Sequence, residues 1–191
     1  MLALPPAPAP APRRQVLVGT ALFCGAAAML IGAMTALWFH FRDTAGTTAW
    51  KPKKVIIPEV ATNVMWITAL LACLIIQWAV YSAKRGDHHH TSVAIGITIV
   101  LGLAHLNSQA YVWKKIALPV KGDTAYSSMF YAITGTLFVL VVVGVAYAIV
   151  SAFRFIGGRT KDRETVSGLA LYWYFLAAAN TAVWFTVYVT K

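Results

Sequence analysis

Five long stretches of this 191-residue chain contain no Asp, Glu, Lys or Arg, and they decide what the chain can fold into. Each is longer than the roughly 20 residues that a helix needs to cross a hydrocarbon core about 30 Å thick. Because backbone polar groups in lipid must be paired within the segment, these stretches predict helices. The chain is therefore predicted to be an all-α integral membrane protein with five transmembrane helices. The expected spans are 15–39, 60–83, 91–113, 124–153 and 165–190.

The composition agrees with this interpretation and excludes a soluble domain. Hydrophobic residues make up 59% of the chain and charged residues only 12%, against about 25% charged residues in typical soluble domains. The alternating segments of about 10 residues that a transmembrane β-barrel requires are absent from the sequence. The first stretch is too long for a signal peptide core and lacks a small-residue cleavage site. We expect a flexible Pro/Ala-rich tail at 1–14, followed by one five-helix domain at 15–191.

The basic residues do not reveal how the chain is oriented in the membrane. Segments on one side of the predicted bundle carry eight Lys and Arg residues, and segments on the other side also carry eight. The positive-inside rule therefore gives no orientation. The basic residues also form no single face with interleaved aromatics, so the sequence does not predict nucleic-acid binding.

The predicted spans carry little chemistry of their own. Buried charges mark most pumps, proton-coupled transporters and voltage sensors, and these spans have none. His105 is the one histidine deep inside a span, and we interpret it as a hydrogen-bonded packing residue rather than a haem or copper ligand. Asn107, Ser108 and Gln109 are predicted to form hydrogen bonds between helices. Cys24 and Cys73 lie in different spans and are interpreted as small hydrophobic side chains.

Small and aromatic residues in the spans predict how the helices pack. Gly25 and Gly32 in the first span, and the alanines at 177–179 in the last, are expected to let helices approach closely. Aromatic residues gather near the span ends, as in the belts that anchor helices at the head-group level. These features favour a structural or accessory membrane subunit without catalytic residues of its own.

Five stretches, taken in chain order, resemble a known family: VGTALFCGAAAMLIGAMTALWFHF, QWAVYSAKRGD, NSQAYVWKK, YSSMFYAITG and LYWYFLAAANTAVWFTVYVTK. Together they look like subunit III of the haem-copper cytochrome c oxidases, over residues 16–191. The count of five helices is similar to that of bacterial forms without two extra N-terminal helices.

The chain departs from the family pattern at several polar positions inside the spans. The family has a glutamate in its matching first helix and another after its Gln-Ala-Tyr run. It also has two histidines in the penultimate helix, and a histidine and an aspartate in the last. The corresponding residues here are Ala27, Val112, Leu137, Leu140, Tyr174 and Ala177.

The resemblance implies an accessory, non-redox subunit of an aa3-type cytochrome c oxidase in aerobic respiration. Such a subunit binds phospholipid, stabilises the catalytic subunit I and supports its proton uptake. The chain itself would bind no haem or metal, and haem a and copper are expected in partner subunits. The expected location is the inner membrane of a bacterium, with the N-terminus in the cytoplasm. The residues that we expect to face lipid or other subunits are Gln109, Tyr111, Tyr126, Phe130, Tyr131, Tyr172, Trp173 and Phe175.

Two alternatives remain open at this point. The first is a subunit III-like accessory of a quinol oxidase or a nitric oxide reductase, because the choice of electron donor resides in other subunits. The second is an independent small transporter or channel, which would call for a buried ion-coupling residue or a helix broken within its span.

Three consecutive histidines, His88, His89 and His90, follow Asp87 in the short corner between the second and third spans. Consecutive residues in a turn project in different directions, and no second cluster supplies further ligands, so a metal site is not expected. We interpret the stretch as a solvated polar loop. Histidines titrate around neutral pH. Since the resemblance places this corner on the proton-uptake side, a second hypothesis makes these four residues a surface proton antenna.

Overall fold

The computed structural model shows five long helices that account for most of the chain. It describes residues 14–46, 50–52, 55–116, 118, 124–157 and 163–190, and nearly all of the expected N-terminal tail lies outside these residues. All five helices are long and apolar enough to cross a membrane, so the prediction of an all-α protein with five membrane-spanning helices is confirmed. The helices are α1 (Gln15–Ala45), α2 (Glu59–Arg85), α3 (His88–Ile116), α4 (Ala125–Ile156) and α5 (Arg163–Val183), which continues as the π-helical segment η1 (Trp184–Val189).

Most of the helices extend past the ends of the uncharged stretches. Helix α1 continues to Ala45, six residues beyond the predicted span, and α3 already begins at His88. Charge marks where a helix leaves the hydrocarbon, but the backbone hydrogen bonds continue through the polar head-group region. The prediction of a loop for the three histidines is therefore wrong, because they form the first turn of α3.

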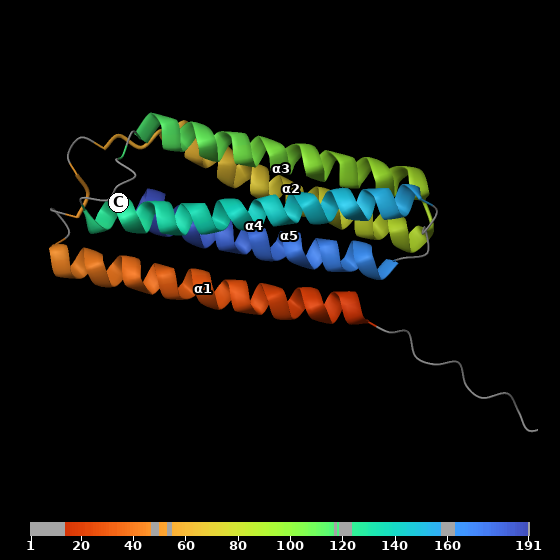
Figure 1. The fold of residues 1–191 in the computed structure, drawn as a ribbon. Coiled ribbons are helices and arrows are strands. Elements are labelled where there is room, and N and C mark those ends of the chain that lie inside the picture. Colours follow the sequence, from red (N-terminus) through yellow and green to blue (C-terminus); the bar gives the residue numbers. More distant parts are fainter. Residues whose placement is uncertain are drawn as a thin grey trace, which may run out of the picture.

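The helices form one bundle in which α1 lies at one edge and α3 at the opposite edge (Figure 1). Helix α5 contacts α1, α2 and α4, while α3 packs mainly on α2 and α4. Within the most apolar 18 residues of each helix, 61% are buried in α5 and only 17% in α1. Helix α5 is thus the centre of the bundle, and most of α1 faces outward.

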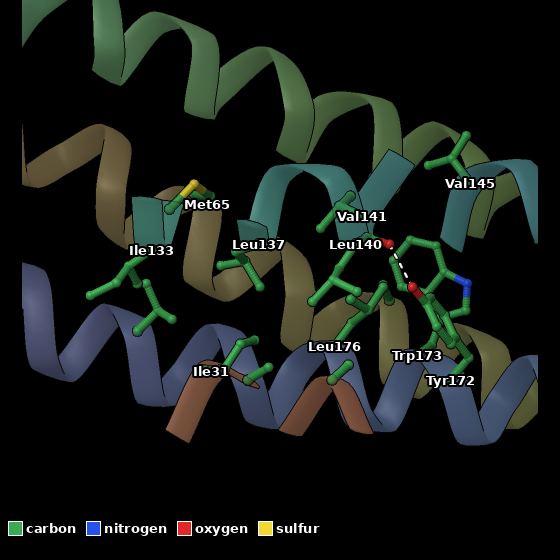
Figure 2. Close-up of a cluster of buried hydrophobic side chains, with 14 of the residues drawn as sticks. Ile31, Met65, Ile133, Leu137, Leu140, Val141, Val145, Tyr172, Trp173 and Leu176 are labelled. Atoms are coloured by element: carbon green, nitrogen blue, oxygen red, sulfur yellow. Dashed lines mark hydrogen bonds between the residues drawn. The ribbon is translucent and has the colours of Figure 1, made fainter. Parts of the chain in front are cut away.

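The core is formed by apolar side chains from all five helices, and Figure 2 shows a part of it to which α1, α2, α4 and α5 contribute. Met65, Leu137 and Leu176 are each at most 2% exposed. Tyr172 reaches from α5 to α4, where its hydroxyl donates a 2.8 Å hydrogen bond to the carbonyl oxygen of Leu140. This bond pairs a polar atom that would otherwise be costly inside the bundle.

Close helix contacts occur at glycines other than those expected from the sequence. A Cβ atom added at Gly25 or Gly32 would meet nothing within 4 Å. At Gly102 the same atom would lie 2.6 Å from Val145 and 2.8 Å from Trp173. The prediction for Gly25 and Gly32 is thus wrong within this chain, because both lie on the exposed face of α1. Gly102 is instead the point where α3 meets α4 and α5.

A carboxylate in the first turn of α5 binds the N-terminus of α1 and joins the two helices. Oε1 of Glu164, in the first turn of α5, accepts hydrogen bonds from the backbone N–H groups of Val16 at 2.7 Å and Leu17 at 3.2 Å. The first N–H groups of a helix lack partners within the helix, and a negative charge there is favourable. Glu164 therefore caps a helix that is distant in sequence and fixes the start of the outermost helix.

Candidate functional site

Three aromatic rings meet at the end of the bundle where α1 ends and α4 begins. Trp38 is 0% exposed, and its ring centroid lies 5.1 Å from that of Trp50 and 5.3 Å from that of Tyr126. The rings of Trp50 and Tyr126 are 5.5 Å apart and nearly perpendicular. Such edge-to-face contacts between aromatic rings add about 0.5–1.5 kcal/mol each beyond the area that they bury. The cluster ties the segment after α1 to the start of α4.

A second group of predicted site residues continues from this cluster into the bundle. The ring of Phe130 is nearly parallel to that of Tyr126, with 6.3 Å between the ring centroids. It lies edge-on to the ring of Tyr188 in η1, with 6.2 Å between the centroids. The side chain of Gln109 and the hydroxyl of Tyr188 are 3.5 Å apart and form a buried polar pair. This pair is the hydrogen bond between helices that was predicted for Gln109. Asn107, by contrast, is exposed.

The eight residues predicted to face lipid or other subunits do not form one surface. Gln109, Tyr126, Phe130, Tyr172 and Trp173 are buried among the chain's own helices. The other three lie nearer the surface, and each has its own setting. The hydroxyl of Tyr131 donates to the carbonyl oxygen of Leu118, Phe175 is half-buried, and Tyr111 is 48% exposed beneath the ammonium of Lys115. A lipid or subunit contact stays a prediction for all eight, and Tyr111 is the most accessible of them.

His105 is buried between helices in the middle of α3. Its ring nitrogen Nδ1 lies 3.3 Å from the carbonyl oxygen of Met65 on α2. This contact confirms that His105 is a hydrogen-bonded packing residue. Within the ranges that the structure describes, no three His, Cys, Asp or Glu side chains gather closely enough to hold a metal ion.

The corner between α2 and α3 places Asp87 directly before the first turn of α3. Its Oδ1 accepts a 3.1 Å hydrogen bond from the backbone N–H of His90, and its Oδ2 lies 2.6 Å from Nδ1 of the same residue. The backbone N–H of His90 and then its imidazole lower the pKa of the Asp87 carboxyl. Asp87 thus remains an anion at neutral pH and holds the imidazole of His90 in place.

The structure separates the three histidines into different environments. His90 faces Asp87 and Trp78 of α2, with a distance of 5.8 Å between the Trp78 and His90 rings. The ring of His88 lies 5.5 Å from that of Phe155, near the end of α4. His89 is exposed beside His90. The hypothesis of a proton antenna stays a prediction. The three histidines have different neighbours, so they would not contribute equally to such an antenna.

The positions that depart from the family pattern are mostly buried in apolar surroundings. Val112 and Leu137 are at most 1% exposed, and Ala27, Leu140 and Ala177 are 6% or 7% exposed. Tyr174 is the exception, because it is 39% exposed and its hydroxyl donates to the side-chain oxygen of Gln77. Because a buried charge without a partner is costly, apolar replacements at the buried positions fit this packing.

Two features of the site were missed by sequence reasoning. The Asp-x-x-His spacing of Asp87 and His90 is that of a helix N-cap and its third residue, and this spacing is visible in the sequence. The contact of Glu164 with α1 joins residues 148 and 147 positions apart. No local pattern predicts a contact over that separation.

Comparison with known proteins identifies what the chain resembles. Residues 13–191 match the family described as cytochrome c oxidase subunit III. A subunit 3 from Corynebacterium diphtheriae is 24% identical over 180 residues, which cover 91% of this chain and 87% of that protein. The Drosophila yakuba subunit is 25% identical over 74% of this chain and 54% of its own length. A probable subunit from Rickettsia bellii is 29% identical over 66% of this chain and 48% of its own length. The chain thus spans about half the length of the last two relatives.

Proposed function

The chain belongs to the cytochrome c oxidase subunit III family, and from this we propose that it is the accessory, non-redox subunit of an aa3-type oxidase. The observation that carries the proposal is a family match over residues 13–191 that includes all five membrane-spanning helices. In this function the chain holds no redox centre, while haem a and copper lie in partner subunits. The proposed location is a bacterial inner membrane, with the N-terminus in the cytoplasm.

The proposed partners are the catalytic subunit I, other oxidase subunits and phospholipid. Helix α1 supports this part of the proposal, because most of its apolar surface has no partner within the described chain. Leu22 and Met29 are 71% and 79% exposed. Packed side chains rather than a hydrophobic force hold helices together in lipid, so such a surface suits either lipid tails or a neighbouring subunit.

Affinity purification of the tagged chain in mild detergent tests the proposal. We expect a subunit I that contains haem a to co-purify, and the absorption spectrum of the haem identifies it. The untagged strain taken through the same steps is the control. Recovery of the chain alone and free of haem would contradict the proposal. A different haem spectrum would instead indicate a quinol oxidase or a nitric oxide reductase.

We also propose that Asp87, His88, His89 and His90 collect protons for the neighbouring catalytic subunit. Replacing the three histidines by Gln is expected to lower oxidase turnover partially above pH 7.5, where free protons are scarce. Turnover near pH 6 is expected to be unchanged, since protons are then abundant. The measurement is oxygen consumption by the purified complex against pH.

The matched control for the antenna replaces Lys114 and Lys115 at the other end of α3 by Gln. This pair also carries charge but lies on the opposite membrane side. Equal turnover of the triple histidine variant and the wild type above pH 7.5 would remove the antenna from the proposed function and leave the assignment as a subunit intact.

A further inference from the structure

A small polar pocket lies at the corner between α2 and α3, and nothing above assigns it a ligand. Its volume is about 200 Å³. Three other pockets, which include Phe23, Leu30 and Ile31 of α1, have mostly apolar walls, whereas polar and charged side chains make up much of the wall of this one. The lining residues are Trp78, Tyr81, Ser82, Arg85, Asp87 and His90.

The pocket lies at the depth of lipid head groups. Helix α2 has 27 residues and is therefore about 40 Å long at 1.5 Å per residue. A hydrocarbon core is about 30 Å thick, and the bilayer with its head groups is about 40–45 Å thick. The last turn of α2, which carries Ser82 and Arg85, therefore reaches the head-group layer. Trp78 and Tyr81 are residues of the kind that anchor at this level.

Two side chains with nitrogen donors, Arg85 and His90, border the pocket, and both are held in position by neighbours. The guanidinium carbon of Arg85 lies 4.2 Å from the centre of the Tyr81 ring. The imidazole of His90 is fixed through Nδ1 by Asp87 at 2.6 Å. Within the described chain, the His90 ring forms no second hydrogen bond, so Nε2 remains for a ligand. Arg85 and His90 together can supply several N–H donors to an anion, with the hydroxyl of Ser82 beside them.

We propose that this pocket binds the phosphate group of an anionic membrane lipid. Phosphate oxygens suit a guanidinium and an imidazolium, and aromatic walls suit the glycerol and first methylene groups of a lipid. The proposal needs only the membrane position of the corner and not the assignment to an oxidase. If the chain does not bind the lipid here, the assignment to an oxidase is unaffected, and the reverse also holds.

The contact of Nδ1 with Asp87 leaves Nε2 as the atom of the His90 ring that can contact a ligand. Because the Asp87 carboxylate accepts the proton on Nδ1, Nε2 carries a proton only when the ring is charged. Nε2 therefore donates to an anion only from the imidazolium form of the ring. The other charged or titratable groups around His90 are Arg85 and Tyr81 across the pocket and His89 beside it. Lys84 at the end of α2 and His88 at the start of α3 are the other charged or titratable residues of this corner, and neither lines the pocket.

The test uses the full chain in a neutral detergent, titrated with short-chain phosphatidylglycerol and followed by calorimetry. Replacing Arg85 by Gln is expected to weaken binding about tenfold or more, as for loss of a charged hydrogen-bond donor. Replacing His90 by Gln is also expected to weaken binding, because the ring nitrogen Nε2 that would donate to the phosphate is lost.

Matched variants and a second ligand decide between the outcomes. Lys84→Gln and His89→Gln remove the same kinds of charge at the same corner without lining the pocket, and both are expected to bind as the wild type does. Equal losses in Lys84→Gln and Arg85→Gln would overturn the proposal, because only general charge attraction would remain. Binding of inorganic phosphate without binding of phosphatidylglycerol would overturn the lipid as ligand and assign the pocket to a soluble phosphate.

Discussion

Replacement of Gly102 by Val is expected to lower the free energy of unfolding by about 3 kcal/mol. The new Cβ atom would lie 2.6 Å from Cγ2 of Val145 and 2.8 Å from Cη2 of Trp173. Both partners are at most 5% exposed and sit in the core, so neither can move away without disturbing its own neighbours. Helix α3 would be pushed away from α4 and α5. Unfolding of the purified chain in mixed detergent micelles with increasing SDS, followed by circular dichroism, measures the loss.

The matched control for this variant is Gly96→Val on the same helix. A Cβ atom at Gly96 meets nothing within 4 Å, so valine there is expected to change stability by no more than about 0.5 kcal/mol. The two variants have the same composition and nearly the same helix propensity. Equal losses at Gly96 and Gly102 would show that valine acts on the helix itself and not on the contact with Val145 and Trp173.

Replacement of Trp38 by Ala is expected to cost about 3–5 kcal/mol, the range for loss of a fully buried Trp side chain. Trp38 is 0% exposed and contacts both Trp50 and Tyr126 at the end of the bundle. Loss of the indole leaves a cavity between α1, the segment after it and α4. We expect faster amide hydrogen exchange in the first turn of α4 as well as a lower overall stability.

Leu37 provides the control for Trp38. It is the preceding residue on α1, but its side chain is 47% exposed. Leu37→Ala is expected to change stability by no more than about 0.5 kcal/mol and to leave exchange at the start of α4 unchanged. If Trp38→Ala shows no more exchange there than Leu37→Ala, the aromatic cluster does not hold α1 and α4 together.

The corner before α3 shows how much of a candidate site can be predicted from sequence. The sequence correctly predicts that the three histidines lie between the second and third spans, because the uncharged stretches on both sides end there. Their assignment to a loop was wrong, since a polar helix start and a polar loop have the same composition. The pairing of Asp87 with His90 and the stacking of Arg85 on Tyr81 required coordinates. These contacts distinguish a defined pocket from three exposed histidines.

The sequence alone determined that this chain is a membrane protein with five spanning helices, because lipid excludes charge and leaves helices as the way to pair the backbone. It also carried the motifs that indicate the family. Only the tertiary structure decided which face of each helix is buried. In lipid both the inner and the outer face of a helix are apolar, so hydrophobic periodicity does not separate them. Gly25 on the outside and Gly102 in the core therefore look alike in sequence, and only the packing of neighbouring side chains distinguishes them.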